Sequence, residues 1–147
     1  MRTSGKRFSL SMISSITNQG KLRYMMYKGA LNADMFLNFL KRLKKSSEMP
    51  VYVILDNLRV HHAIRVQEWV SKQRGQVQLF FLPAYSPEYN PDEYLNQDLK
   101  SAMSKKLRPT SENALRNNVQ YHMKGLSKKR SKVKRFFKHK YVQYAAA

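Results

Sequence analysis

The chain of 147 residues carries 28 Lys and Arg against nine Asp and Glu, which gives a net charge of +19. So basic a surface attracts polyanions, with nucleic acid as the expected partner and an anionic membrane surface as the competing one. The absence of cysteine excludes disulfides and thiolate zinc sites, and no apolar run approaches the roughly 20 residues that span a bilayer.

The first predicted elements are a hairpin and a helix. Phe8, Leu10 and Met12 alternate with serines, and residues 22–27 alternate again after the turn-forming residues 18–20, which predicts two antiparallel strands. Apolar residues at helical spacing then predict a helix that begins after Asn32 as N-cap and ends before Pro50.

A strand, a helix and a second strand follow. Residues 51–55 are almost uniformly apolar, which suits a central strand covered on both faces. A helix is expected over 63–73, with Val66, Trp69 and Val70 facing inward, and a strand over 77–82. This order predicts a parallel pair of strands.

The last third of the chain reads as two helices and a basic tail. Pro91 fits the first turn of a helix with an apolar stripe up to Met103. Ser111 is expected to cap a further helix that runs to about Met123. The whole order predicts an α/β fold with a mixed sheet, with residues 1–125 as the domain and 126–147 as the tail.

Two acidic residues stand where a metal site is expected. Asp56 follows the apolar strand, and ligands of α/β sheets bind at such strand ends; it could instead cap the next turn. Glu93 could equally be a first-turn residue favoured by the helix dipole. Together the two carboxylates could hold Mg²⁺ or Mn²⁺ and support phosphodiester chemistry.

Other polar residues near these acids have a simpler interpretation. Asp92 and Asp98 lie off the Glu93 face of the expected helix, so both are taken as solvent-facing or capping residues. One of His61 and His62 could approach a scissile phosphate, but the favoured interpretation is a pair that starts the next helix.

The basic tail is interpreted as a contact surface for DNA phosphates. A solvated charge run is the simpler alternative, and Phe136 and Phe137 are expected to pack the tail against the domain. The residues expected to contact DNA are Lys128, Lys129, Arg130, Lys132, Lys134 and Arg135.

Three segments carry a family resemblance: ILDNLRVHH (54–62), FFLPAYSPEYNP (80–91) and DEYLNQDLK (92–100). They resemble bacterial insertion-sequence transposases of the mariner-related DDE superfamily, and the resemblance extends over nearly the whole chain. It implies an RNase H-like fold whose Asp-Asp-Glu triad binds two Mg²⁺ ions, nicks DNA and transfers the strand.

The resemblance also assigns roles to single residues. Asp56 matches the family's second acid and Glu93 its third, with 36 residues between them. The pocket-shaping positions are Asn57, His61, Ser86 and Asn90.

The chain departs from the family pattern at its amino end. The family's first Asp lies on a strand upstream of the hairpin, and that strand is central in the sheet, between the hairpin and the strand before Asp56. Asp34 is no substitute, because it belongs to a helix behind the sheet. We therefore expect an RNase H-like sheet that lacks this strand, with unpaired backbone groups on the two flanking strands.

These expectations define a functional hypothesis. The chain is expected to be the carboxy-terminal part of a transposase and to be inactive alone. Its expected substrate is double-stranded DNA (transposon ends and target), on which it acts as a homo-oligomer. The expected location is the bacterial cytoplasm, in association with the nucleoid and not with a membrane. A candidate partner is an upstream polypeptide that supplies the first Asp. Alternatives are a non-catalytic basic DNA-binding remnant and an RNA-binding protein of the translation apparatus.

Overall fold

The computed structural model describes residues 9–146, so Phe8, expected in the first strand, lies outside them. The helices and strands in chain order are β1 (Ser11–Ile16), β2 (Leu22–Tyr27), α1 (Ala33–Lys45), β3 (Val51–Leu55), α2 (Ile64–Lys72), β4 (Val77–Phe81), α3 (Asp92–Ser104), α4 (Glu112–Ser127) and α5 (Arg130–Arg135). Short 3-10 turns are η1 (Arg59–His62), η2 (Pro87–Tyr89), η3 (Phe136–Lys138) and η4 (Lys140–Ala146).

The strands form two separate pairs. β1 and β2 make the expected antiparallel hairpin, with Ser11 opposite Tyr27 and Ile16 opposite Leu22. β3 and β4 make the expected parallel pair, with Val51 opposite Val77. Within residues 9–146, neither β1 nor β3 forms ladder hydrogen bonds with a second strand.

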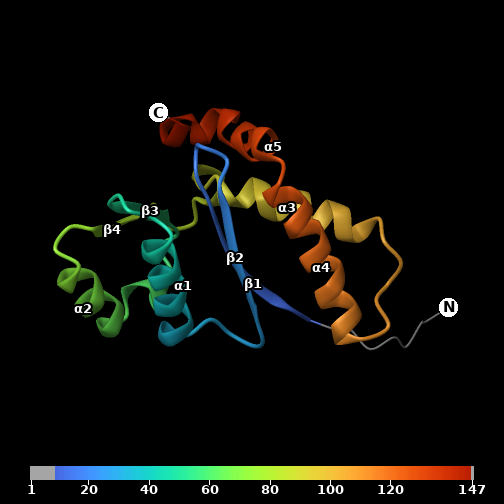
Figure 1. Cartoon of the computed structure of the whole chain (residues 1–147), viewed down its shortest axis with the longest axis horizontal. Coiled ribbons are helices and arrows are strands. Elements are labelled where there is room, and N and C mark those ends of the chain that lie inside the picture. The colour runs from blue at the N-terminus through green and yellow to red at the C-terminus, as the bar shows by residue number, and fades with distance from the viewer. Residues whose placement is uncertain (1–8, 147) are drawn as a thin grey trace.

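The hairpin lies between α1 on one side and α3 and α4 on the other (Figure 1), and a hydrophobic cluster fills each side. On one side it packs with α3, α4 and α5, where Leu95 and Met123 are fully buried. On the other side Ile13 of β1 reaches the cluster built by α1, α2 and β3, around Leu40 and Val66. Because side chains alternate along a strand, β1 contributes to both clusters.

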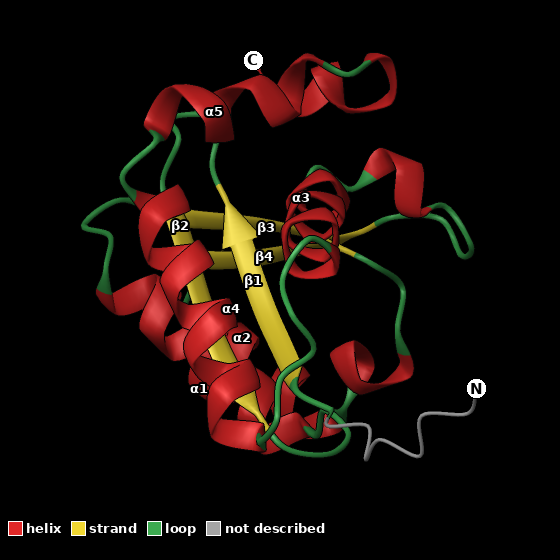
Figure 2. Ribbon diagram, turned by 90° about the vertical axis from the view of Figure 1, so that its right-hand side faces the viewer, coloured by secondary structure: helices red, strands yellow, loops and turns green. Residues whose placement is uncertain are grey.

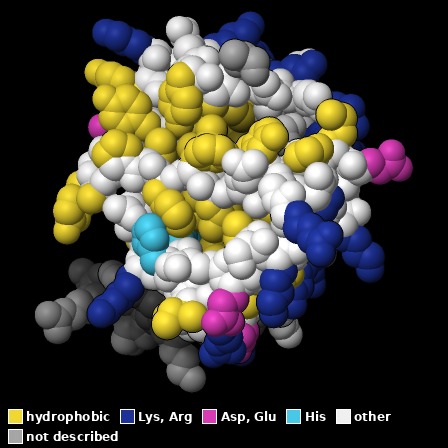
Figure 3. All heavy atoms as spheres, turned by 90° about the vertical axis from the view of Figure 1, so that its left-hand side faces the viewer, with side chains coloured by type: hydrophobic (Ala, Val, Ile, Leu, Met, Phe, Trp, Pro, Cys, Tyr) yellow, Lys and Arg dark blue, Asp and Glu magenta, His cyan; other side chains and the backbone are white. Residues whose placement is uncertain are grey.

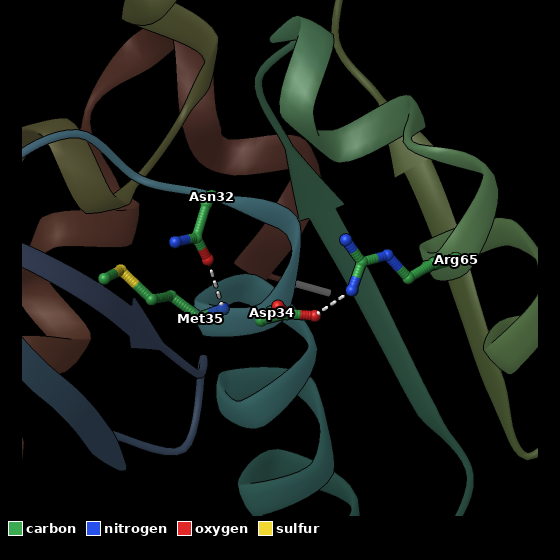
Figure 4. Close-up of polar contacts among 4 residues, drawn as sticks. All are labelled: Asn32, Asp34, Met35 and Arg65. Carbon is green, nitrogen blue, oxygen red and sulfur yellow. Dashed lines mark hydrogen bonds and ion pairs between the residues drawn. The ribbon is translucent and has the colours of Figure 1, made fainter.

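Helix α1 begins as its sequence predicts. The Asn32 Oδ1 atom accepts a hydrogen bond from the Met35 backbone N–H at 2.9 Å (Figure 4), which confirms the N-cap. The carboxylate of Asp34 pairs with Arg65 of α2 at 2.5 Å, on the surface. Such an exposed pair contributes less than about 1 kcal/mol, and it holds Asp34 toward α2.

The prediction that residues 51–55 form a strand covered on both faces is wrong. Val53 and Leu55 face the cluster around α1 and α2, but Tyr52 is 62% exposed and Ile54 37%. Phe80 and Phe81 of β4 are exposed as well. Hydrophobic side chains gather across the middle of the surface in Figure 3, which views the side of the molecule on which β3 and β4 lie.

The carboxy-terminal segment packs on the domain. Val133, Phe136, Phe137 and Val142 are buried, which confirms the packing role expected for the two phenylalanines. The ring of His139 stacks on Tyr94 of α3 with centroids 3.8 Å apart. α4 runs to Ser127, beyond the expected end at Met123, because buried Leu126 continues its apolar face. No helix in residues 9–146 is long and apolar enough to cross a membrane.

Candidate active site

The loop between β4 and α3 brings the start of α3 to the end of β3. Asp56 follows β3 directly, and Glu93 lies in the first turn of α3. The side chain of Asn90 joins the two elements: its Nδ2 group donates to Asp56 Oδ1 at 3.2 Å, and its Oδ1 accepts from the Asp92 backbone N–H at 3.1 Å. One asparagine therefore fixes the Asp56 carboxylate relative to the helix that carries Glu93.

The charges of Asp56 and Glu93 interact. Partial burial raises the pKa of Glu93, the negative charge of Asp56 raises it further, and Lys100 acts in the opposite direction. Lys100 is seven residues after Glu93, two turns along the helix, so both lie on the same face of α3.

Asp92 contradicts its interpretation as a solvent-facing or capping residue. The Ser14 hydroxyl of β1 lies 2.9 Å from one Asp92 carboxylate oxygen and 2.7 Å from the other, and it donates to that carboxylate. Burial raises the pKa of Asp92 to about 7; the Ser14 hydrogen bond lowers it, and the charges of Glu93 and Asp56 raise it. β1 runs beside α3 (Figure 2), and the hydrogen bond from Ser14 joins the strand to the first turn of the helix.

The donor set fits a hard divalent cation. Asp56 and Glu93 offer oxygen ligands, and the repulsion between neighbouring carboxylates is relieved when a cation binds them. Mg²⁺ commonly uses one or two protein carboxylates and keeps several waters. Among residues 9–146, no three His, Asp or Glu side chains converge into a complete set of ligands, so these two acids would form only part of the coordination sphere.

His61 supports the backbone at Asp56. Its ring is buried, lies 4.5 Å from the Phe36 ring, and donates from Nδ1 to the Asp56 carbonyl oxygen at 2.7 Å. Burial lowers the pKa of His61, against the effect of the Asp56 carbonyl and carboxylate, and the neighbouring His62 lowers it as well. This fits a neutral ring that holds the loop. The two histidines, expected at the start of the next helix, lie instead in the turn η1, and α2 begins at Ile64.

The other pocket-shaping candidates, Asn57 and Ser86, bond to residues close to them in sequence, and within residues 9–146 neither forms a hydrogen bond to the carboxylate of Asp56 or Glu93. The Asn57 side chain accepts a hydrogen bond from His62 Nε2, and the His62 ring stacks on Phe81. The Ser86 hydroxyl donates to the Ala84 carbonyl at 3.2 Å within the loop. Tyr85 between them has a φ of 57° and a fully exposed side chain. A tyrosine at positive φ is uncommon, and such strain often accompanies functional loops.

The predicted DNA-contacting residues surround α5. Lys128, Lys129, Arg130, Lys134 and Arg135 are exposed. Lys132 is half-buried and pairs with Asp98 Oδ1 at 2.9 Å, while His122 Nε2 donates to Asp98 Oδ2 at 2.9 Å. Asp98 is therefore neither a solvent-facing nor a capping residue. Its own burial raises its pKa, but the hydrogen bonds and charges of Lys132 and His122 outweigh this and leave the pKa below its usual range.

Comparison with known proteins identifies the family. Residues 1–116 match the family model described as "DDE superfamily endonuclease". No curated protein matches the chain.

Several solved structures share the fold, among them two of the Mos1 transposase catalytic domain. The Mos1 transposase catalytic domain in a structure titled with raltegravir and Mg has a TM-score of 0.63 and 16% identity, over 94% of this chain and 83% of that one. A structure of the catalytic domain of Mos1 mariner transposase has a TM-score of 0.61 and 15% identity, over 93% and 80%. This likeness confirms the RNase H-like α/β fold. The chain belongs to the DDE superfamily endonucleases.

Proposed function

We propose that the chain carries out DNA transposition by metal-assisted cleavage and joining of phosphodiester bonds, with Asp56 and Glu93 as metal ligands. The observation that best supports this is the bond from Asn90 to Asp56, which links the end of β3 to the helix of Glu93. A metal bound there, proposed to be Mg²⁺ with Mn²⁺ as a substitute, would activate the attacking oxygen and stabilise the leaving one.

Each residue of the centre has a distinct part in this proposal. Asp56 and Glu93 provide oxygen ligands from two different elements, and Asn90 orients the first of them. His61 holds the backbone that presents Asp56. Loop residues 83–89, which include Ser86, and Asn57 after the end of β3 shape the approach of the DNA strand.

The proposal also includes a further strand, supplied by another polypeptide, that pairs with β1 and β3. Unpaired strand edges are costly or open to pairing, and both β1 and β3 have such an edge within residues 9–146. β1 and the end of β3 both hold the start of α3, through Ser14–Asp92 and Asp56–Asn90. An upstream polypeptide that pairs with these edges could bring the triad's first Asp, and the chain is proposed to be inactive without it.

Double-stranded DNA, as transposon ends and target, is the proposed substrate. The exposed bases around α5 are proposed to contact its phosphates. A homo-oligomer is proposed for the active complex, since joining requires several DNA ends in one assembly.

The proposal is tested by metal binding and nicking. Mn²⁺ binding to the chain, followed by electron paramagnetic resonance, is expected to weaken at least about tenfold in Asp56→Asn and Glu93→Gln, because each loses a charged ligand. Asp34→Asn is the matched control, since that carboxylate pairs with Arg65. With the upstream polypeptide added, Mn²⁺-dependent nicking of plasmid DNA is expected and should fall at least about 100-fold in both variants.

The same experiment separates the alternative function. A basic DNA-binding remnant would bind DNA with unchanged affinity in all variants, would bind no Mn²⁺ through Asp56 and Glu93, and would nick nothing. That combination of results would refute the catalytic proposal.

A further inference from the structure

A hollow of about 500 Å³ lies between the end of α3, the second half of α4 and α5. We call it the lysine groove. Five lysines line it: Lys106, Lys124, Lys128, Lys129 and Lys132. Tyr121 and His122 complete its polar wall. Figure 1 shows α4 leading directly into α5 beside α3, which is how residues from three helices come together.

The groove has a large excess of positive charge. Asp98, bonded to Lys132 and His122, is the carboxylate that offsets it. The other four lysines form no ion pair with any acid in the described part of the chain, and Lys106 instead lies 5.2 Å from the centre of the Tyr121 ring. Like charges gathered around one hollow repel each other at physiological salt, where the Debye length is about 8 Å. A ligand with several negative charges would remove that repulsion.

The shape and chemistry favour a nucleic-acid backbone over a membrane. The hollow is concave, whereas a membrane surface is flat, and its apolar member Leu126 is buried. Tyr121 is 76% exposed at the edge, where an aromatic ring can contact sugar or base. The lysines provide flexible point charges for phosphates.

The groove lies on a different side of α3 from the candidate active site. Glu93 interacts with Asp56 and Lys100, while Asp98 bonds to the groove residues Lys132 and His122. The five residues between Glu93 and Asp98 turn the helix by about 140°. DNA held in the groove therefore contacts a surface from which Glu93 points away.

We propose that the lysine groove is a second DNA-backbone site, which holds a duplex segment other than the one at Asp56 and Glu93. This rests on the proposed function in one respect, that the polyanion is DNA. The groove would then fix a transposon end or target segment while the active site works on another.

The test compares two triple variants of the full chain. Lys124→Ala/Lys128→Ala/Lys129→Ala removes three exposed charges at the end of α4. Lys41→Ala/Arg42→Ala/Lys45→Ala removes three exposed charges at the end of α1, with the same change in net charge. Affinity for a labelled 30-base-pair duplex is measured in EDTA by fluorescence anisotropy over a range of salt concentrations.

The groove variant is expected to bind at least about tenfold more weakly near 0.15 M salt, with a slope of log K against log salt smaller by about 2.7, because each lost phosphate contact removes about 0.9. The control is expected to change less than about threefold. Equal losses in the two variants, or no loss in either, would overturn the proposal. The proposal would also be overturned if phosphatidylserine vesicles displaced the labelled duplex more readily than unlabelled duplex does at the same phosphate concentration.

A second measurement locates the DNA and separates this proposal from the catalytic one. The chain has no cysteine, so Tyr121→Cys can carry a single iron chelate that cuts nearby DNA. Cutting is expected from position 121 and not from a chelate at exposed Ser71→Cys on α2; equal cutting from both would refute the groove. The triple variant of the groove should still bind Mn²⁺, because its lysines lie away from the metal site. Asp56→Asn should still bind the duplex in EDTA. A failure of the groove proposal can therefore be told apart from a failure of the catalytic proposal.

Discussion

The carboxyl group of Asp92 has a pKa of about 7 in the folded chain, against an ordinary value of 3.8. The folded state therefore keeps a proton that the unfolded chain has already released between those two values. The stability that this group contributes is fully present below about pH 4 and is lost as the pH rises through 7. At about 1.4 kcal/mol for each pKa unit, the loss is up to about 4 kcal/mol.

Asp92→Asn removes this dependence, because an amide does not titrate. Relative to the parent chain, the variant is expected to gain stability steadily from pH 4 to pH 8, as measured by urea unfolding in EDTA. Ser14→Ala should have the opposite effect and steepen the loss, since the Ser14 hydroxyl lowers the Asp92 pKa. Identical pH profiles for the parent chain and Asp92→Asn would show that this carboxyl is not held protonated.

Sequence reasoning at this scale succeeded where a residue depends on its own element. Asn32 and Ser111 accept the capping hydrogen bonds that their positions predict. Asp92 was interpreted wrongly because its partner, Ser14, lies 78 residues away on another element. The one available signal was a serine between two apolar residues on the same strand face.

The β1–β2 turn depends on a close contact with the segment that starts α5. Gly20 has a φ of +85°, and a Cβ placed there would lie 2.6 Å from the Arg130 carbonyl oxygen. Gly20→Ala must therefore both strain the backbone and displace Arg130. Gly29 has a φ of +77° with no atom within 4 Å of its Cβ position, so Gly29→Ala brings the strain alone.

The pair of variants isolates the contact. Gly29→Ala is expected to destabilise the chain by about 1 kcal/mol through its backbone conformation. Gly20→Ala should cost about 1–3 kcal/mol more, as overpacked sites do, when free energies of unfolding are compared in urea. Equal losses of unfolding free energy in the two variants would mean that the contact between the hairpin turn and the start of α5 does not contribute to stability.

Most elements could be predicted from local pattern, but their assembly could not. The spacing of apolar residues gave α1, α2 and α3 and the parallel pair of β3 and β4 close to their observed bounds. The exposed face of β3 was missed because a uniformly apolar strand says nothing about which neighbours are present. The burial of Val133 and Val142 likewise depends on distant partners, so charge dominated the interpretation of the tail.

At the scale of the whole molecule, like charges oppose folding. The 28 Lys and Arg outnumber the nine Asp and Glu about threefold, and compaction brings the positive charges together. Salt screens this repulsion but also weakens attraction within ion pairs. The ion pairs of Lys28 and Arg65 are exposed and contribute less than about 1 kcal/mol each, so relief of repulsion is expected to dominate.

We therefore expect the melting temperature to rise as NaCl increases from 0.05 to 0.5 M, by roughly 3 °C, which corresponds to about 1 kcal/mol for a chain of this size. Heparin at 0.05 M NaCl should produce a similar or larger rise, because it binds the folded chain and neutralises several lysines at once.

An uncharged solute, glycerol at matched viscosity, controls for general solvent effects. Light scattering at each salt concentration must remain at the monomer level, since the exposed side chains of Tyr52 and Phe80 could associate. A melting temperature that falls with salt would mean that the ion pairs, including Lys132 with Asp98, outweigh the excess positive charge.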